Sequence, residues 1–439
     1  MFGTSGIRGA VGTEVTAALA LRVGRALGAE TDRVVVGRDP RDSGEVLVDA
    51  AAAGLRELGT DVVDLGMAAT PTVARSVGWL GADAGLAVTA SHNPPEDNGL
   101  KLWQPSGQAY DTADQNRIAE RIEADEYDLR PWDGLGTRTA ADTSARHVGT
   151  LLEAAGGADA LDLEIAVDLG NGAGGVTVEA LIEAGCAVET LNAQPDGRFP
   201  GRPSEPTEAN CRALAALVAD GAYDLGIAHD GDADRTRAVA GDGTFLSGDA
   251  LLTLFAADAA EAGRRVAVPV DTSLAVEDFL ADRGVAVTRT PVGDVHVAEA
   301  ARAEDVAFGG EPSGAWIWPE ATLCPDGPLA AVRLAALAAA EPIGKRLEAI
   351  PSYPIRRASI ERTDKAATMA AVEAEVLETY ESVGTLDGVR VERDDGWFLI
   401  RASGTQPLVR LTAEARASGR AEELLAEARS LVEDADGGG

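Results

Sequence analysis

Short apolar runs alternate with longer segments of helical spacing along most of the chain, and this alternation repeats three times. Each copy has an apolar strand ending in an acidic or glycine turn, a helix, a second strand introduced by glycine, and a third strand ending in polar residues. The predicted first strands are 34–39, 165–170 and 266–271, the second strands are 59–65, 185–191 and 284–290, and the third strands are 85–91, 224–230 and 305–311. Strands that alternate with helices predict largely parallel sheets with helices on both faces.

The last quarter of the chain follows a different pattern. Residues 353–360 alternate between apolar and polar side chains, a helix rich in Ala and Glu follows at 366–382, and 396–401 and 407–412 are further strand candidates. Such alternation is typical of a small α+β domain. The predicted fold is therefore α/β, with three similar α/β domains of mixed, mostly parallel sheets and a smaller C-terminal α+β domain around a central cleft. The predicted domains are 1–148, 149–246, 247–351 and 352–439.

The composition of the 439 residues predicts a cytoplasmic protein with packed cores. Hydrophobic residues make up 45% of the chain, but no uninterrupted apolar stretch reaches the about 20 residues that a membrane span requires. The start lacks the basic and apolar regions of a signal peptide. The three cysteines, Cys186, Cys211 and Cys324, are unclustered and show no metal-binding spacing, which favours a reducing compartment.

The net charge of −34 makes nucleic acid and anionic membranes unfavourable partners. Acidic residues are spread along the chain, and only Lys101, Lys345 and Lys365 are lysines. Excess carboxylate with scarce lysine is typical of proteins adapted to high intracellular salt, where screening weakens self-repulsion. A GC-rich genome would also replace lysine by arginine, but would not supply the acidic excess. Halophily is therefore a hypothesis, and full folding and activity without added salt would count against it.

The ends of the three third strands carry the candidate chemistry. Ser91, Asp230 and Glu311 occupy equivalent positions in the three copies, and ligands of open α/β sheets bind beyond the carboxyl ends of the strands. Three similar domains facing one cleft would bring these residues together. Ser91 is a candidate nucleophile flanked by His92, and we predict a turn at Asn98-Gly99 with Lys101 just beyond it.

The segment Asp230-Gly-Asp-Ala-Asp-Arg235 is a candidate metal site. Three carboxylates at alternate positions suit a hard divalent cation, although a solvated acidic turn would have the same composition. An EF-hand loop requires Gly at its sixth position and Glu at its twelfth, where this chain has Arg235 and Gly241. The EF-hand interpretation therefore fails. Mg²⁺ is the favoured ion because it needs few carboxylates and completes its coordination with phosphate or water.

Further segments supply candidate groups for binding a sugar phosphate. Glu311 and Ser313 lie on a glycine-bracketed loop that could accept hydrogen bonds from hydroxyls, although the same loop could be an ordinary surface turn. Arg401-Ala-Ser-Gly-Thr-Gln-Pro-Leu-Val-Arg410 offers the guanidinium groups, hydroxyls and backbone amides that a phosphate requires. The turns at 3–9 and 37–43 add further arginines as possible anion-binding parts. The absence of dinucleotide-binding and P-loop motifs argues against a nucleotide.

Four of these motifs, in this order, resemble the α-D-phosphohexomutases, and the resemblance extends from Phe2 to about Ala417. The resemblance implies that Ser91 carries a phosphate and that this phosphate and three aspartates hold Mg²⁺. It implies that Arg8 and Lys101 serve the reacting centre, to which we add His92 as a neighbour of Ser91. The metal ligands would be Asp230, Asp232 and Asp234, and the substrate-binding residues would be Arg235, Glu311, Ser313, Arg401, Ser403, Gly404, Thr405 and Arg410.

The resemblance also implies a mechanism, in which the phosphate on Ser91 passes to a hexose monophosphate and the other phosphate of the resulting bisphosphate returns to Ser91. A sugar 1,6-bisphosphate would then act as activator. Ala315 stands where many relatives have His, with His296 as a possible replacement, and Gln406 stands where Glu is usual. The segments 90–94 and 97–101 are closer to phosphoglucosamine mutases, and 310–316 and 323–327 are similar to their archaeal relatives. Glucose and mannose phosphates stay open as substrates.

Two other functions fit parts of the pattern. A metal-dependent sugar phosphatase would pass the phosphate of Ser91 to water, but a mutase must exclude water from a closed cleft. A non-catalytic sugar-phosphate or cation-binding protein would not need a nucleophile at Ser91. We expect a hexose phosphate as the small-molecule partner and a monomer or homodimer as the assembly.

Overall fold

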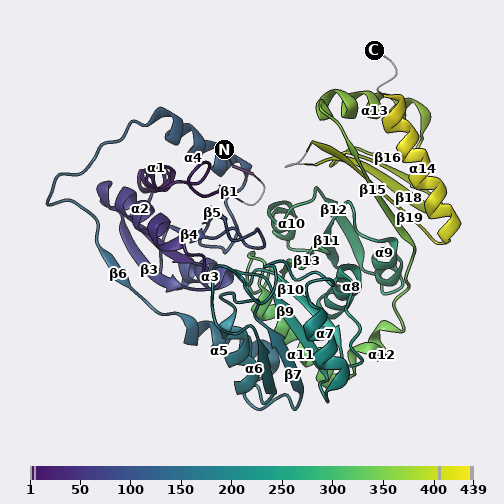
Figure 1. Cartoon of the computed structure of the whole chain (residues 1–439), viewed down its shortest axis with the longest axis horizontal. Coiled ribbons are helices and arrows are strands. Elements are labelled where there is room, and N and C mark those ends of the chain that lie inside the picture. The colour runs from purple at the N-terminus through teal and green to yellow at the C-terminus, as the bar shows by residue number, and fades with distance from the viewer. Residues whose placement is uncertain (1, 4–5, 404–406, 436–439) are drawn as a thin grey trace.

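The computed structural model describes residues 2–3, 6–403 and 407–435, which form four separate sheets (Figure 1). The first sheet has six strands, in the order β1 (Ile7–Ala10), β5 (Asp97–Trp103), β4 (Ala84–Val88), β2 (Arg33–Arg38), β3 (Asp61–Met67) and β6 (Arg138–Ala140). The helices of this part of the chain are α1 (Ala17–Gly28), α2 (Gly44–Glu57), α3 (Thr70–Trp79) and α4 (Thr112–Ala124).

The second and third sheets have four strands each. The order in the second sheet is β10 (Thr236–Ala240), β9 (Leu225–His229), β7 (Glu164–Asp168) and β8 (Ala187–Leu191), with helices α5 (Ser144–Ala155), α6 (Gly175–Glu183) and α7 (Arg212–Asp220). The order in the third sheet is β12 (Ala286–Thr290), β11 (Arg265–Pro269), β13 (Val306–Gly310) and β14 (Trp316–Ile317). Its helices are α8 (Gly248–Ala259), α9 (Leu274–Ala281), α10 (Asp294–Ala301), α11 (Gly327–Ala340) and α12 (Ile343–Leu347).

These three sheets share one arrangement, which confirms the predicted repeat. In each sheet the first strand of the copy pairs in parallel with the second strand on one side and with the third strand on the other. A further strand, which the apolar pattern did not predict, runs antiparallel to the third strand: β5, β10 or β14. Every residue of β4, β9 and β13 is buried, as expected for strands covered on both faces.

One local prediction about the first sheet is wrong. Asn98 and Gly99 lie inside strand β5 and do not form a turn. Gly99 lies where two backbones approach closely, because a Cβ there would be 2.4 Å from the carbonyl oxygen of Ile7 and 2.6 Å from that of Thr89. The strand continues to Lys101, whose backbone pairs with Ala87 in β4. The strand pairing therefore brings Lys101 alongside the strand that leads to Ser91.

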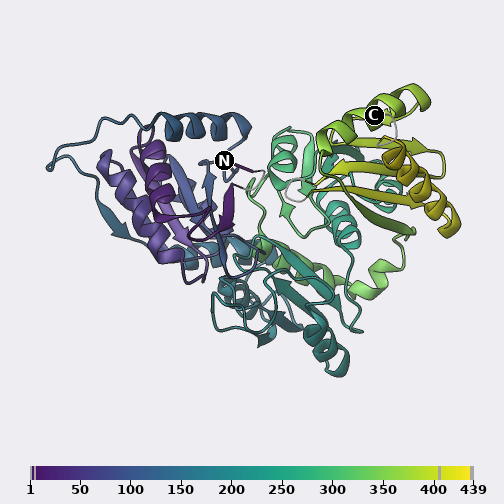
Figure 2. The same ribbon diagram turned by 45° about the horizontal axis from the view of Figure 1, so that its top comes forward.

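The fourth sheet is antiparallel throughout and confirms the predicted α+β domain. Its order is β15 (Ile355–Glu361), β19 (Leu408–Ala415), β18 (Gly396–Ala402), β17 (Val389–Arg393) and β16 (Val383–Gly384). Helices α13 (Lys365–Thr379) and α14 (Ser418–Asp434) pack against each other and against this sheet (Figures 1 and 2). The short strands β16 and β17 were not predicted from the sequence.

The four sheets follow an arc, with the first and fourth sheets at its two ends (Figure 1). One continuous hydrophobic core serves the second and third sheets together, and α11 packs on α5 and α6. The fourth sheet is joined to the third through a smaller apolar cluster that includes Val270, Leu274, Trp397 and Leu399. Beside it, the buried carboxylate of Glu414 accepts hydrogen bonds from the backbone N–H of Leu274 and the indole N–H of Trp397.

We propose four domains that correspond to the four sheets and their helices. The predicted boundary at 148 falls inside α5, and Val148 and Leu151 of that helix belong to the core of the second and third sheets. We therefore place the first boundary ahead of α5 and retain the others at 246 and 351. Within the described part of the chain, each helix is too short or too polar to cross a membrane.

Candidate active site

Ser91 lies three residues beyond the end of β4, in a constrained backbone conformation. Its φ of 50° is in the left-handed region, which is unfavourable for residues other than glycine and is common at functional sites. The backbone N–H of Ser91 donates to Oγ1 of Thr89 at 2.8 Å, and its carbonyl accepts from the guanidinium of Arg41 at 2.9 Å. The hydroxyl is thereby presented to the candidate metal site at 230–235, called the metal loop below. Its Oγ is 2.6 Å from Oδ2 of Asp230 and 3.5 Å from Oδ1 of Asp234.

The turn at 37–43, predicted as a possible anion-binding part, has a structural role instead. The side chain of Arg41 is fully buried and forms an ion pair with Asp39 at 2.9 Å. Its remaining N–H groups donate to backbone carbonyls of the Ser91 loop, those of Ser91, Asn93, Pro94 and Asp97. The prediction is wrong for Arg41 because its donors are already used within the protein.

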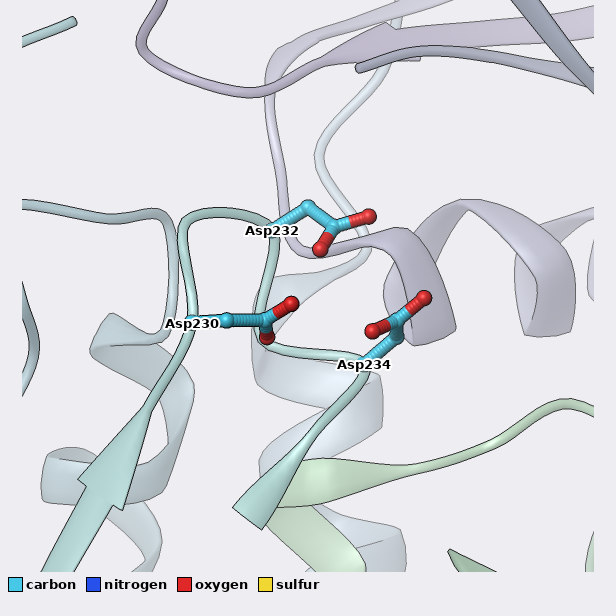
Figure 3. Close-up of side chains that lie close together, drawn as sticks. All are labelled: Asp230, Asp232 and Asp234. Atoms are coloured by element: carbon cyan, nitrogen blue, oxygen red, sulfur yellow. The ribbon is translucent and has the colours of Figure 1, made fainter. Parts of the chain in front are cut away.

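Asp230, Asp232 and Asp234 come together in the loop between β9 and β10, with a carboxylate oxygen of each within 4.8 Å of the others (Figure 3). All three side chains are buried. Burial and the charges of Asp234 and Asp232 raise the pKa of Asp230 well above its usual range, and burial and Asp232 raise the pKa of Asp234. Oδ1 of Asp232 has no hydrogen-bond partner among the described residues. A hard divalent cation would be a partner for this oxygen and would neutralise the clustered charge, so these residues fit Mg²⁺.

Lys101 is buried beneath this loop between two carboxylates. Its Nζ is 2.7 Å from Oδ2 of Asp294 and 3.6 Å from Oδ2 of Asp234. Burial favours the neutral amine, but the two carboxylates outweigh it and raise the pKa of Lys101 above its usual value. Lys101 is therefore protonated at neutral pH and can supply positive charge or a proton. It is not suited to act as a base.

His92 points toward the nucleophile, with Nδ1 3.3 Å from Oγ of Ser91. Burial and the nearby positive charges of Arg235 and Arg8 lower the pKa of His92 to about 2. The imidazole is therefore neutral at physiological pH. It can exchange a hydrogen bond with the hydroxyl without adding charge to the site.

A cavity of about 510 Å³ collects side chains from all four domains. Of the predicted site residues, its wall contains Arg8, Ser91, His92, Asp234, Arg235, Glu311, Ser313, Arg401, Ser403 and Arg410. Lys101, Asp230 and Asp232 are buried close to this wall but do not line it. Gly404 and Thr405 lie outside the described residues. The four arginines suit this wall to phosphate groups, and Asp234, Asp294, Glu311 and Asp387 add four carboxyl groups to it.

Residues 292–294 connect two parts of this wall with the buried Lys101 and were not predicted as site residues. The backbone N–H of Val292 donates to Oδ2 of Asp387 at 3.0 Å, and that of Gly293 donates to Oε1 of Glu311 at 2.8 Å. The next residue, Asp294, accepts the hydrogen bond from Lys101. Gly293 has a φ of 134°, which a side chain would strain. Asp387 also lies 3.6 Å from Nη1 of Arg401, so this segment reaches the predicted phosphate-binding residues.

The carboxyl group of Glu311 offers a direct test of the electrostatics of the site. Burial, and secondarily the charge of Asp294, raise the pKa of Glu311 from 4.5 to about 7. The folded protein therefore retains a proton that the unfolded chain has released, so the free energy of unfolding should fall as the pH rises from about 4.5 to 7. We expect Glu311→Gln to remove this contribution, which is about 3 kcal/mol at most. Urea unfolding of both proteins across this range, at constant salt, measures it, and parallel pH profiles would contradict the assignment.

Comparison with known proteins gives matches over nearly the whole chain. Family profiles described as phosphoglucomutase/phosphomannomutase match four segments: alpha/beta/alpha domain I at residues 1–128, domain II at 146–243, domain III at 247–353 and the C-terminal domain at 357–431. A protein of Methanopyrus kandleri named "Probable phosphoglucosamine mutase" is 45% identical, over 98% of this chain and 97% of that protein. One of the same name from Methanococcoides burtonii is 42% identical over 99% of both chains.

Solved structures show the same architecture. The crystal structure of a phosphoglucomutase/phosphomannomutase family protein from Burkholderia thailandensis has a TM-score of 0.86 and 28% identity, covering 100% of this chain and 99% of that one. The N-acetylphosphoglucosamine mutase of Aspergillus fumigatus, in complex with GlcNAc-6P and magnesium, has a TM-score of 0.61 and 16% identity, covering 99% and 95%. The second likeness concerns the fold alone.

Proposed function

This chain belongs to the phosphoglucomutase/phosphomannomutase family, and we propose that it interconverts the 1-phosphate and 6-phosphate of a hexose, with glucosamine phosphate as its main substrate. The observation that carries this proposal is the cavity shared by all four domains. It holds a buried serine hydroxyl beside three carboxylates, together with Arg401, Ser403 and Arg410 from the fourth domain. A phosphate carrier and a separate phosphate-binding group in one cavity are what an intramolecular phosphate transfer requires.

In the proposed reaction, the bond between phosphorus and Oγ of Ser91 breaks and the phosphoryl group forms a bond to the unphosphorylated hydroxyl of the substrate, which gives a sugar 1,6-bisphosphate. The hydroxyl of the substrate loses its proton in this step, and Oγ of Ser91 gains one. The bisphosphate turns around in the cavity, and its other phosphoryl group returns to Ser91. Arg401, Ser403 and Arg410 would hold whichever phosphate is not reacting, with Gly404 and Thr405 proposed as further contacts. Because positioning and charge neutralisation dominate phosphoryl transfer, the fixed geometry of these groups is the main contribution of the protein.

The other predicted site residues have complementary proposed roles. Asp230, Asp232 and Asp234 would hold Mg²⁺, which neutralises negative charge on the transferring phosphate. Arg8 and Arg235 would contact the phosphate near Ser91, and Lys101 would supply positive charge or a proton.

Glu311 and Ser313 would orient the hydroxyls of the sugar. His92 would exchange a hydrogen bond with Ser91. Ala315 stands where many relatives have a histidine for proton transfer, and our candidate for that role is His296, which lines the same cavity as Ala315.

The activator, the location, the assembly and the salt adaptation of the protein are further proposals. We propose that a sugar 1,6-bisphosphate primes the enzyme by phosphorylating Ser91. We also retain a cytoplasmic location, a monomer or homodimer, and adaptation to high salt as predictions from the sequence.

The choice of sugar is supported by the names of the archaeal relatives and by the charge of the cavity wall. Glucosamine phosphate carries an ammonium group at neutral pH, and Asp294, Glu311 and Asp387 place carboxyl groups in the wall. We expect kcat/KM for glucosamine 6-phosphate to exceed that for glucose and mannose phosphates by roughly 10-fold or more, since a charged group that finds a partner contributes about 1.5–3 kcal/mol.

Side-by-side assays with the three sugars, Mg²⁺ and the matching bisphosphate test this expectation. Equal rates with all three would contradict the proposed preference and leave a general hexose phosphate mutase. Stoichiometric release of inorganic phosphate would instead identify a phosphatase.

A further inference from the structure

The metal loop of the second domain is fastened to the first domain by two hydroxyl groups. Thr70, the first residue of α3, donates from Oγ1 to Oδ2 of Asp232 at 2.6 Å, and its backbone N–H donates to the carbonyl of Asp232 at 2.9 Å. Ser204 donates to the carbonyl of Ser91 at 2.8 Å and accepts from the backbone N–H of Gly231 at 2.9 Å. Both hydroxyls are buried, so the loop and Ser91 have fixed relative positions.

The two carboxylate oxygens of Asp232 have different surroundings because only one of them contacts Thr70. Oδ2 accepts the hydroxyl of Thr70, whereas Oδ1 is buried and has no hydrogen-bond partner in the described ranges 2–3, 6–403 and 407–435. A short hydrogen bond to a charged acceptor fixes the plane of the carboxylate. Oδ1 is the oxygen that remains for a cation shared with Asp230 and Asp234.

We propose that Thr70 is a positioning residue for the cation site, which orients Asp232 so that Oδ1 faces the ion. This role rests on the proposed Mg²⁺ site. It means that a residue of the first domain sets the affinity of the metal loop of the second domain for the cation. Hydrogen bonds that orient metal ligands typically change metal affinity by about 10–100-fold. The affinity for the cation therefore depends on correct docking of the two domains that supply the phosphate carrier and its metal.

The structure allows the hydroxyl of Thr70 to be removed with little other change. Thr70 does not cap its helix with its side chain, and its backbone bond to Asp232 is independent of the hydroxyl. Ser204 continues to hold the metal loop through Gly231. A Thr70→Val substitution keeps the shape of the side chain, and Thr70→Ser keeps the hydroxyl.

Mg²⁺ titrations of the full-length, unphosphorylated protein by calorimetry, without sugar phosphate, test the inference. We expect Thr70→Val to weaken Mg²⁺ binding by roughly 10-fold or more and Thr70→Ser to stay within about 3-fold of the wild type. In assays, the turnover of Thr70→Val should return close to that of the wild type at saturating Mg²⁺, which a loss of general structure would not allow. Thr70→Ala serves as a second variant if valine prevents folding.

Ser76→Ala is the matched control, because Ser76 is a buried hydroxyl of the same helix that bonds to Thr72 and Thr143, away from the metal loop. We expect its Mg²⁺ affinity to equal that of the wild type. Unchanged affinity in Thr70→Val and Thr70→Ala, or an equal loss in Ser76→Ala, would overturn the role of Thr70 while leaving the cation site in place. Failure of the wild type itself to bind Mg²⁺ would overturn the cation site and, with it, this inference.

Discussion

A Ser91→Ala variant should fold and bind sugar phosphate but lose turnover by roughly 10⁴-fold or more, because no other group can carry the phosphoryl between the two halves of the reaction. The substitution removes the contacts of the hydroxyl with Asp230, Asp234 and His92. It leaves the backbone bonds of residue 91 to Thr89 and Arg41 in place. We therefore expect a change in stability of about 1–3 kcal/mol. Steady-state assays measure the turnover, and thermal unfolding measures the stability. Intact mass spectrometry shows whether the variant still carries phosphate.

Ser313→Ala is the matched control for this variant, since Ser313 is an exposed serine in the wall of the same cavity. It should raise KM and keep Ser91 phosphorylated, with kcat within about 10-fold of the wild type. Substantial turnover by Ser91→Ala would exclude a phosphoserine mechanism. Turnover lost equally in both variants would show that the cavity, and not the nucleophile, limits the reaction.

The second large effect is expected for Lys101→Met. The buried ammonium group lies between Asp294 and Asp234, and its removal takes away the positive charge that these two buried carboxylates share. Breaking a buried ion pair in this way typically costs about 3–5 kcal/mol of folding free energy. The same variant should lose roughly 10²-fold or more in kcat, because the positive charge that we propose for the transferring phosphate would be absent. Urea unfolding and steady-state kinetics measure the two losses.

A second substitution separates the two roles of Lys101. Asp294→Asn in the Lys101→Met background removes one of the two carboxylates that face the ammonium group in the wild type and should recover most of the stability. It does not restore a positive charge, so kcat should stay low. If stability and kcat both recover, Lys101 acts only through folding. If neither recovers, the assigned ion pair is contradicted.

The gathering of the three strand ends could be predicted because it follows local rules. Ser91, Asp230 and Glu311 each follow a buried apolar strand, and the same strand order in three sheets brings those strand ends to one region. Asp230 and Glu311 directly follow their strands, whereas Ser91 lies three residues beyond β4. The spacing of apolar residues, the burial of a strand and the composition of a turn all depend on near neighbours in the chain, so they can be recognised in the sequence.

The partners of these residues could not be predicted because they come from distant segments. Thr70 is 162 residues from Asp232, and Lys101 is 193 residues from Asp294, so no spacing in the sequence relates them. Arg41 shows the converse error. Its sequence setting suggested an anion site, but only the three-dimensional packing shows that backbone carbonyls occupy its donors.

Residues 292–294 also limit how this chain could be recombined with its relatives. Three consecutive residues bond to Lys101 of the first domain, Glu311 of the third and Asp387 of the fourth, so a crossover anywhere between residues 101 and 387 separates this segment from at least one inherited partner. A chimera can be assembled from compatible folds and still place Lys101, Glu311 and Asp387 out of register with one another. The unit that must be inherited together is thus a set of contacts, and its members are spread from residue 101 to residue 387.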